Sequence, residues 1–206
     1  MKRASLIILA VLLADQILKI WIKTHMFIGQ EYEIADWFII HFTENPGMAF
    51  GLEFGGNWGK LALSVFRIIT VGVIFIWLKR LAEQNAKPIA IVSVSLIFAG
   101  ALGNILDSAF YGLLFSESNS QVATFLPPEG GYAGFLHGHV VDMFYFPLFR
   151  GYLPEWLPFW GGDYFIFFRP IFNLADASIS VGVGLLLLFQ KTVFAADKKE
   201  PQEATS

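Results

Sequence analysis

Four long apolar stretches constrain this chain more than any other feature of its sequence. They cover about residues 4–24, 61–78, 88–107 and 171–189. A helix that crosses a membrane needs about 20 mostly apolar residues, so each stretch is long enough to span a bilayer. Only 15% of the 206 residues are charged, whereas about a quarter are charged in a soluble globular protein. The sequence therefore predicts an α-helical integral membrane protein with four transmembrane helices.

The first stretch has an alternative interpretation. Lys2 and Arg3 precede an apolar run, which is also the pattern of a signal peptide. The segment continues past Asp15, however, with charged residues at regular helical spacing. We therefore interpret it as the first membrane span.

The basic residues predict the orientation of the spans. They lie before the first stretch, between the second and third, and after the fourth: Lys2, Arg3, Lys79, Arg80, Lys87, Lys191, Lys198 and Lys199. Because Lys and Arg accumulate in cytoplasmic loops, both termini are predicted to be cytoplasmic. Residues 25–60 and 108–170 then lie outside. Residues 1–194 form a single domain, and 195–206 are expected to be a disordered cytoplasmic tail.

Composition excludes several kinds of function. The chain has no cysteine, so disulfides, thiol catalysis and cysteine-ligated zinc are excluded. Its formal net charge is −3 and its basic residues form no groove-like run. Both features argue against a nucleic-acid partner.

The outer segments carry several local patterns. Residues 31–44 mix alternating polarity with β-branched and aromatic residues, which predicts a strand. The sequence ENPGMAFG at 44–51 is typical of a turn. Residues 116–131 are expected to be mobile. Residues 143–168 are crowded with aromatic residues and proline, and we expect short helical pieces there that lie in the membrane interface as an anchor or a lid.

Charged residues inside the apolar stretches are candidates for function, because each costs about 2.5 kcal/mol or more to insert. Asp15, Lys19 and Lys23 are spaced four residues apart and share one helix face. Asp15 and Lys19 could form an internal ion pair that only fixes packing. Lys23 is expected to extend to the outer interface, and Arg67 could do the same or pair inward.

Three further acids are predicted to lie near the outer leaflet. The third stretch ends in AGALGNILD, which holds Asn104 and Asp107. The fourth begins with FNLADASI, which holds Asn173 and Asp176 at the same spacing. Because the two stretches run in opposite directions, both pairs lie near the outer surface. Asp142 lies in an apolar run of the outer segment.

Carboxylates that meet at one depth predict acid–base hydrolysis. Two carboxyl groups at contact distance do not both ionise easily, so one keeps its proton. The ionised group can activate water while the protonated group polarises a scissile carbonyl. The residues alone leave Asp107, Asp142 and Asp176 open as members of the pair.

Five motifs, in order along nearly the whole chain, resemble those of the lipoprotein signal peptidases, also called signal peptidase II. They are DQILK at 15–19, ENPGMAFG at 44–51, GALGNILD at 100–107, HVVDMF at 139–144 and FNLADASISVG at 172–182. The resemblance implies an aspartic endopeptidase of the bacterial inner membrane, with four transmembrane helices, a small periplasmic β-cradle and a periplasmic interfacial helix or lid. It implies removal of the signal peptide from diacylglyceryl-modified prolipoproteins just before the lipidated cysteine. It also implies inhibition by globomycin. Because paired acids suffice for hydrolysis, we expect no metal requirement and no cofactor.

The same resemblance implies roles for individual residues. It assigns the catalytic pair to Asp142 and Asp176, near the periplasmic leaflet. It implies that five further motif positions shape the site and bind substrate, namely Asn45, Gly47, Asn104, Asp107 and Asn173. Asp15 and Lys19 match the first motif and are expected to support the site.

The chain departs from the family pattern in two places. Members usually have Arg directly after the GNxxD motif, whereas Ser108 stands there in this chain. A cationic contact to the outer loop or the substrate is therefore either missing or supplied by another residue, for which Arg150 and Arg169 are candidates. The segments 108–138 and 145–170 are also longer than usual.

Three other functions fit parts of the sequence. His137, His139 and Asp142 form an H-x-H-x-x-D pattern that could bind zinc in a metal-dependent membrane protease. A small proton-coupled transporter also places acids inside the membrane, but the chain shows no inverted repeat. A non-enzymatic scaffold would leave three acids at one depth unexplained.

Overall fold

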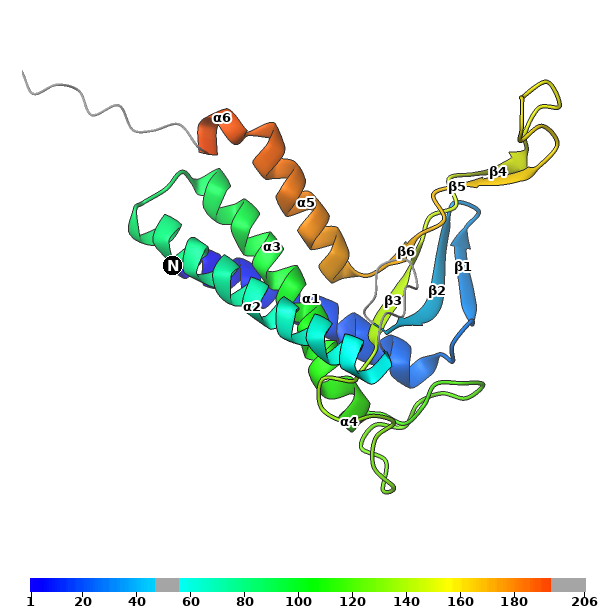
Figure 1. Cartoon of the computed structure of the whole chain (residues 1–206), viewed down its shortest axis with the longest axis horizontal. Coiled ribbons are helices and arrows are strands. Elements are labelled where there is room, and N and C mark those ends of the chain that lie inside the picture. The colour runs from blue at the N-terminus through cyan, green and yellow to red at the C-terminus, as the bar shows by residue number, and fades with distance from the viewer. Residues whose placement is uncertain (47–55, 194–206) are drawn as a thin grey trace, which may run out of the picture.

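The structure is a computed structural model that describes residues 1–46 and 56–193, with the side chains of 56–58 excepted. Four long helices form its larger part: α1 (Lys2–His25), α2 (Gly56–Glu83), α3 (Pro88–Leu106) and α5 (Leu174–Leu188). Helix α3 packs against the other three (Figure 1). The N-terminus and the short α6 (Gln190–Val193) lie at one end of the helices, and a small β-sheet lies at the other, which we call the sheet end.

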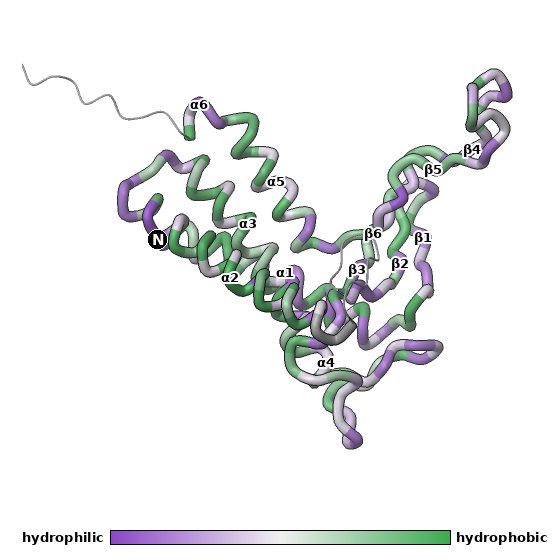
Figure 2. Tube along the Cα trace, in the orientation of Figure 1, coloured by the Kyte–Doolittle hydropathy of each residue, from purple (hydrophilic) through white to green (hydrophobic). Residues whose placement is uncertain are grey.

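The helices expose apolar surface. Residues 2–25, 59–83 and 88–114 are each long and apolar enough to cross a bilayer, while α5 is apolar but has only 15 residues. Leu6 of α1 and Leu188 of α5 are 70% and 80% exposed, and Figure 2 shows hydrophobic residues along all four helices. Exposed apolar surface on this scale marks contact with a membrane or a partner. Together with the lengths of the helices, it fits a membrane protein.

The third span was predicted to end near Asp107, and α3 ends at Leu106, but the chain stays helical beyond it. It passes into the π-helix η2 (Asp107–Tyr111) and the short α4 (Gly112–Leu114). The α-helix itself ends close to the predicted position, but the helical path continues because the polar residues at this point do not reach water. Asp107 and Ser108 are 0% and 5% exposed, and the backbone oxygen of Ser108 accepts a 2.9 Å hydrogen bond from the N–H of Gly138.

The fourth helix begins later than the predicted residue 171. Residues Ile171–Phe172 form strand β6, and Asn173 is the N-cap of α5. The side-chain oxygen of Asn173 accepts a 2.9 Å hydrogen bond from the backbone N–H of Asp176. Such a cap satisfies a donor that the first turn of a helix leaves unpaired. The FNLAD motif is therefore a strand, a cap and a first helical turn.

A four-stranded antiparallel sheet lies at the sheet end. Its order is β1-β2-β3-β6, in which β1 is Glu31–Ala35, β2 is Phe38–Asn45 and β3 is Val140–Tyr145. The single strand predicted over 31–44 is thus a hairpin, because the chain reverses between Ala35 and Phe38, which pair with each other. The turn predicted at 44–51 lies mostly outside the described residues.

Apolar side chains join this sheet to the helices. Ile22 of α1 and Met26, which follows the helix, pack with Phe42 of β2, Met143 of β3 and Phe115, and each is at most 2% exposed. Burial of one such side chain contributes about 1.5–3 kcal/mol to the stability of the fold. The sheet is therefore fixed to the ends of α1 and α4.

Residues 145–170 contain a second hairpin, not the short helical pieces predicted there. Strands β4 (Phe149–Tyr152) and β5 (Tyr164–Phe167) pair antiparallel and project away from the main sheet (Figure 1). The structure describes all of residues 115–173 and contains no helix between them. Aromatic residues favour strands, and the prolines at 147, 154 and 158 interrupt any helix.

Residues 116–131 form no regular strand or helix but are hydrogen-bonded to the end of α1 and the residues after it. The backbone oxygen of Ser118 accepts a 3.0 Å bond from the N–H of Ile28, and that of Lys23 accepts a 3.2 Å bond from Ala123. The mobility predicted for this segment stays a prediction.

Candidate active site

Helix α1 presents three charged residues on one buried face, as their spacing predicts. Lys19 Nζ lies 2.9 Å from Asp15 Oδ2 and 2.7 Å from Asp107 Oδ2. The side chains of Asp15, Lys19 and Asp107 are each at most 1% exposed. The internal ion pair expected between Asp15 and Lys19 is therefore present, and it includes Asp107 of the third span as well.

Asp15 and Asp107 each have a further hydrogen-bond donor. Asp15 Oδ1 accepts a 2.9 Å bond from the backbone N–H of Ala175, in the first turn of α5. Asp107 Oδ1 accepts a 2.8 Å bond from Gln16 Nε2. Gln16 was not among the predicted site residues, although it stands inside the DQILK motif. Together these contacts tie α1 to both α3 and α5.

Glycines allow α3 and α5 to approach closely. A Cβ atom on Gly100 would lie 2.2 Å from the backbone oxygen of Ala175, and one on Gly103 would lie 2.9 Å from Asp15 Oδ2. Neither position has room for a methyl group. Small residues permit such contacts between membrane helices, and here they set the distance between Asn104 on α3 and the first turn of α5.

Two asparagines connect the remaining acids. Asn104 Nδ2 donates a 2.8 Å hydrogen bond to Asp176 Oδ1. Asn173 Nδ2 donates to Asp142 Oδ1 at 2.6 Å and to Asn104 Oδ1 at 3.2 Å. Lys19 Nζ also donates to Asn104 Oδ1, at 2.9 Å. The fold thus brings together four residues that the sequence analysis named, from β3, α3 and the start of α5.

Asp142 lies on β3 and is only 4% exposed. Burial and the nearby charge of Asp176 raise the pKa of Asp142 to about 7, against opposing effects of Lys19, Asn173 and Asn45. An unperturbed aspartate has a pKa of about 3.9. Within the described residues, neither Asp142 nor Asp176 forms an ion pair. Asp142 can therefore hold a proton close to neutral pH.

A cation on α2, Arg67, acts on Asp176. The charges of Arg67 and Asp176 interact, so Arg67 acts on an acid of the sheet end, although the two side chains form no ion pair with each other. Arg150, one of two arginines considered as a replacement for the family's Arg, instead donates a 3.2 Å hydrogen bond to the backbone oxygen of Asp36. Neither Arg150 nor Arg169 forms an ion pair with any described residue.

The two expected site residues of the second motif differ in what the structure describes. Asn45 is the last residue of β2, and its side chain hydrogen-bonds Asp142. The pairing of β2 with β3 places Thr43 opposite Asp142. Gly47 lies outside the described residues.

The histidines of the H-x-H-x-x-D pattern do not converge on Asp142. His137 Nδ1 contacts the backbone oxygen of Phe135 at 2.9 Å, and His139 Nδ1 contacts Glu44 Oε2 at 3.0 Å. The described part of the chain contains no group of three His, Asp or Glu side chains arranged to hold a metal ion.

A second buried ionic cluster was missed by the sequence analysis. Lys23 was expected to reach the membrane surface but is 0% exposed, with its Nζ 2.5 Å from Glu44 Oε1 and 2.9 Å from Ser118 Oγ. Burial acts to raise the pKa of Glu44, but the hydrogen bond with His139 and the charge of Lys23 outweigh it and lower the pKa. In the sequence, the only indication that Glu44 belongs to the site was its position next to Asn45 in the ENPGMAFG motif.

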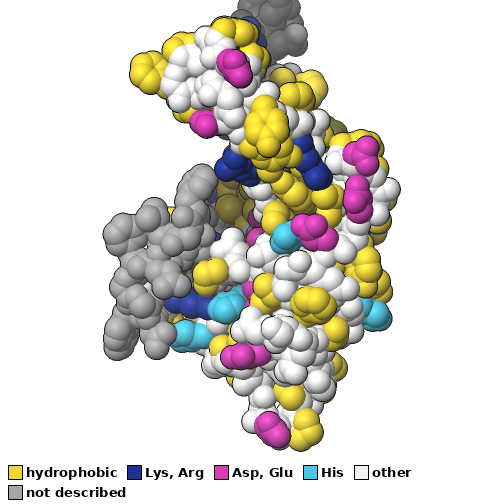
Figure 3. All heavy atoms as spheres, turned by 90° about the vertical axis from the view of Figure 1, so that its right-hand side faces the viewer, with side chains coloured by type: hydrophobic (Ala, Val, Ile, Leu, Met, Phe, Trp, Pro, Cys, Tyr) yellow, Lys and Arg dark blue, Asp and Glu magenta, His cyan; other side chains and the backbone are white. Residues whose placement is uncertain are grey.

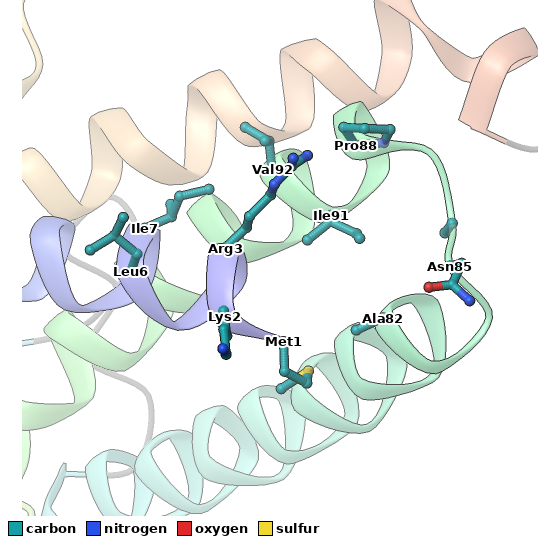
Figure 4. A pocket seen from close by; sticks show the side chains of 11 residues that line it. Met1, Lys2, Arg3, Leu6, Ile7, Ala82, Asn85, Pro88, Ile91 and Val92 are labelled. Carbon is teal, nitrogen blue, oxygen red and sulfur yellow. The ribbon is translucent and has the colours of Figure 1, made fainter.

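A cavity of about 680 Å³ lies at the opposite end of the helices (Figure 4). The start of α1 and the connection between α2 and α3 line it with Met1, Lys2, Arg3, Leu6, Ile7, Ala82, Asn85, Ala86, Pro88, Ile91 and Val92. No acid is among these residues. The cavity is therefore distinct from the candidate active site.

Known proteins match the chain over nearly its whole length. Residues 7–192 match the model of the family described as Signal peptidase (SPase) II. This chain belongs to the signal peptidase II family. The lipoprotein signal peptidase of Porphyromonas gingivalis is 53% identical over 192 residues, which are 92% of this chain and 83% of that protein. That of Amoebophilus asiaticus is 38% identical over 186 residues, or 88% of this chain and 75% of that protein.

Two solved structures of bacterial membrane enzymes are similar to this signal peptidase II chain. One is 27% identical with a TM-score of 0.61 and covers 97% of this chain and 94% of its own. The other is 28% identical with a TM-score of 0.59, covering 92% and 93%. The family confirms the resemblance of the five motifs. With the apolar helices, it establishes a membrane protease that processes lipoproteins, and it gives no support to the transporter or the metal-dependent protease.

Proposed function

We propose that this signal peptidase II works as an aspartic endopeptidase in which Asp142 and Asp176 form the catalytic pair. It removes the signal peptide from diacylglyceryl-modified prolipoproteins, cutting just before the lipidated cysteine. The observation that carries the assignment is the difference in partners among the acids. Asp15 and Asp107 contact Lys19, whereas Asp142 and Asp176 contact the amides of Asn173 and Asn104.

The two acids act in opposite protonation states. Asp142, whose pKa is raised to about 7, donates a hydrogen bond to the carbonyl oxygen of the scissile peptide bond. Asp176 takes a proton from a water molecule, whose oxygen attacks the carbonyl carbon. The proton of Asp142 passes to the carbonyl oxygen, which gives a neutral tetrahedral diol. The proton on Asp176 then passes to the peptide nitrogen as the C–N bond breaks, while the diol returns a proton to Asp142.

The surrounding residues hold this pair in place. Asn173 donates to Asp142 and also caps α5, the helix that carries Asp176. Asn104 donates to Asp176. Asn45 contacts Asp142 from β2. Lys19, which pairs with Asp15 and Asp107, donates a hydrogen bond to Asn104 and so holds it in place. It acts as support without touching substrate. Gly47 is proposed as a further site-shaping residue on its motif alone.

The position of the pair supports a substrate that is held at a membrane surface. Asp176 is in the first turn of α5 and Asp142 is in the sheet beside it. A peptide in extended form can lie along this sheet while its lipid stays among the apolar helices. We place the active site near the periplasmic leaflet of the bacterial inner membrane, with both termini cytoplasmic. We expect globomycin to inhibit the enzyme.

The test is cleavage of a diacylglyceryl-modified prolipoprotein peptide by purified protein in detergent. Asp142→Asn and Asp176→Asn each keep the size of the side chain but can no longer exchange the proton, so each should abolish cleavage at normal expression. Asp107→Asn should reduce it less or act through stability. Substantial turnover by Asp142→Asn, with Asp107→Asn folded but inactive, would move the pair to Asp107 and Asp176.

A further inference from the structure

The β4–β5 hairpin exposes an unusual number of large apolar side chains. Tyr152, Trp156, Phe159 and Trp160 are 75%, 78%, 94% and 61% exposed. Other large hydrophobic residues of the hairpin are also at least 36% exposed, namely Leu148, Phe149, Tyr164, Phe165, Phe167 and Phe168. Soluble surfaces rarely carry apolar patches of more than a few hundred Å². Something other than water therefore covers this hairpin.

The exposure affects both faces of the hairpin. β4 and β5 each have three exposed residues and one intermediate residue. Because side chains alternate between the faces of a strand, both faces are bare. A protein partner would cover one face, whereas lipid surrounds both. A two-stranded hairpin alone is only marginally stable in water, so surrounding lipid would also stabilise it.

The hairpin leaves the fold close to the sheet end of α5. β5 ends at Phe167, and the next residue, Phe168, contacts Phe172 with a distance of 6.0 Å between ring centroids. Helix α5 begins at Leu174, two residues after Phe172. In Figure 1 the hairpin projects sideways from the sheet, across the direction of α1 and α3 and toward the side where α5 lies. An element with this direction runs along a membrane surface, not away from it.

The composition of the hairpin limits its depth. Trp and Tyr side chains concentrate where lipid headgroups meet the hydrocarbon. The outer edges of a two-stranded ribbon carry unpaired backbone groups, which excludes it from the hydrocarbon centre. Glu155 and Asp163 lie near its tip, and the projecting part at the top of Figure 3 shows acidic as well as hydrophobic side chains. Both features fit the headgroup region.

We infer that residues 146–170 form a membrane anchor that lies in the headgroup region of the outer leaflet beside α5. Its partner is phospholipid. The anchor holds the main sheet, which carries Asp142, at a fixed height over the end of α5, which carries Asp176. This deepens the interfacial role expected from the sequence and gives it to a β-hairpin.

Single spin labels test this inference directly, because the chain has no cysteine to compete for the label. Phe159→Cys carries the label at the most exposed aromatic position of the hairpin. Val73→Cys, on the exposed face of α2, is the lipid control, and Glu129→Cys, in the exposed polar loop, is the water control. Each protein is reconstituted in vesicles of phosphatidylethanolamine and phosphatidylglycerol. Collision rates with oxygen report lipid, and those with a nickel chelate report water.

The label at residue 159 should collide with the nickel chelate several-fold less often than the label at 129, and with oxygen nearly as often as the label at 73. Tyr152→Cys gives a second position and should behave in the same way. Nickel collisions at 159 equal to those at 129 would overturn the anchor. So would shielding from both reagents that depends on protein concentration, because a second copy would then cover the hairpin. No substrate is present, so failure here leaves the proposed cleavage untouched.

Discussion

At the scale of single residues, the acids at the sheet end differ in the groups that face them. Asp15 and Asp107 share the ammonium group of Lys19, whereas Asp142 and Asp176 accept hydrogen bonds from amides. An ammonium group favours the charged form of a neighbouring carboxylate, so we propose that Asp15 and Asp107 serve as counterions of Lys19 and that the other two acids exchange protons. The sequence alone could not distinguish Asp107 from Asp142 and Asp176, because it does not show which of these acids lies within reach of Lys19.

Removing Lys19 should damage the fold rather than the chemistry. Lys19→Met leaves Asp15 and Asp107 buried together without a cation, which costs about 3–5 kcal/mol in other proteins. Thermal unfolding in detergent should show a large loss, and adding Asp107→Asn should restore part of it. Lys79→Met is the matched control, because Lys79 faces Glu83 at 3.8 Å with both side chains 60% exposed. It should change stability by less than about 1 kcal/mol.

The raised pKa of Asp142 predicts how both activity and stability depend on pH. The proposed mechanism needs the protonated carboxyl, so kcat/KM should fall as the pH rises above about 7. The folded protein also keeps a proton that the unfolded chain releases near pH 3.9, so the free energy of unfolding falls as the pH rises from about 4 through about 7.

Asp142→Asn removes this loss of stability, which is at most about 4 kcal/mol. The variant should be inactive and yet unfold at a higher temperature than the parent protein at pH 8, with little difference at pH 4. Asp36→Asn, in the exposed turn between β1 and β2, should leave both profiles unchanged. Equal stability of Asp142→Asn and the parent at both pH values would contradict a raised pKa.

At the scale of helices and strands, the contact between α3 and α5 determines whether the pair forms. Gly100→Ala would place a methyl group where Ala175 O lies 2.2 Å away, so α5 must shift and Asn104 loses its geometry with Asp176. We expect a loss of about 1–3 kcal/mol and at least a tenfold drop in kcat. Gly72→Ala on α2, where nothing lies within 4 Å, should keep full activity. Normal turnover by Gly100→Ala would show that the helix distance is not critical.

The same scale shows what the sequence could and could not predict. Apolar length gave the helices, and residues 15, 19 and 23 gave their shared face, because both depend only on local periodicity. The start of α5 depended on the cap of Asn173, and the helical continuation after α3 depended on the burial of Asp107 and Ser108 by distant segments. The β4–β5 hairpin was missed because an aromatic, proline-rich run has no clear period, and its pairing is a long-range contact.

At the scale of the whole molecule, the distribution of basic residues predicts a sidedness that can be measured. Reporter fusions after His139 and after Lys191 should give opposite results, with His139 outside the cytoplasm and Lys191 inside. The structure separates the two positions, since His139 precedes β3 in the sheet and Lys191 lies in α6 at the other end of the helices. If both fusions reported the same side of the membrane, the topology with four transmembrane spans would be contradicted.

The arrangement of helices, sheet and hairpin also predicts that the lipid on the substrate matters. The two acids lie where the sheet meets the end of α5, so a peptide reaches them only if it is held at the level of the membrane surface. A diacylglyceryl group does this, because its chains partition among the apolar helix faces and hold the adjacent peptide bond at that depth. A prolipoprotein peptide without the lipid should therefore be cleaved poorly, mainly through a higher KM. The comparison should use vesicles as well as detergent, since micelles present both peptides at similar local concentration. Equal kcat/KM for the two peptides in vesicles would contradict lipid recognition by this site.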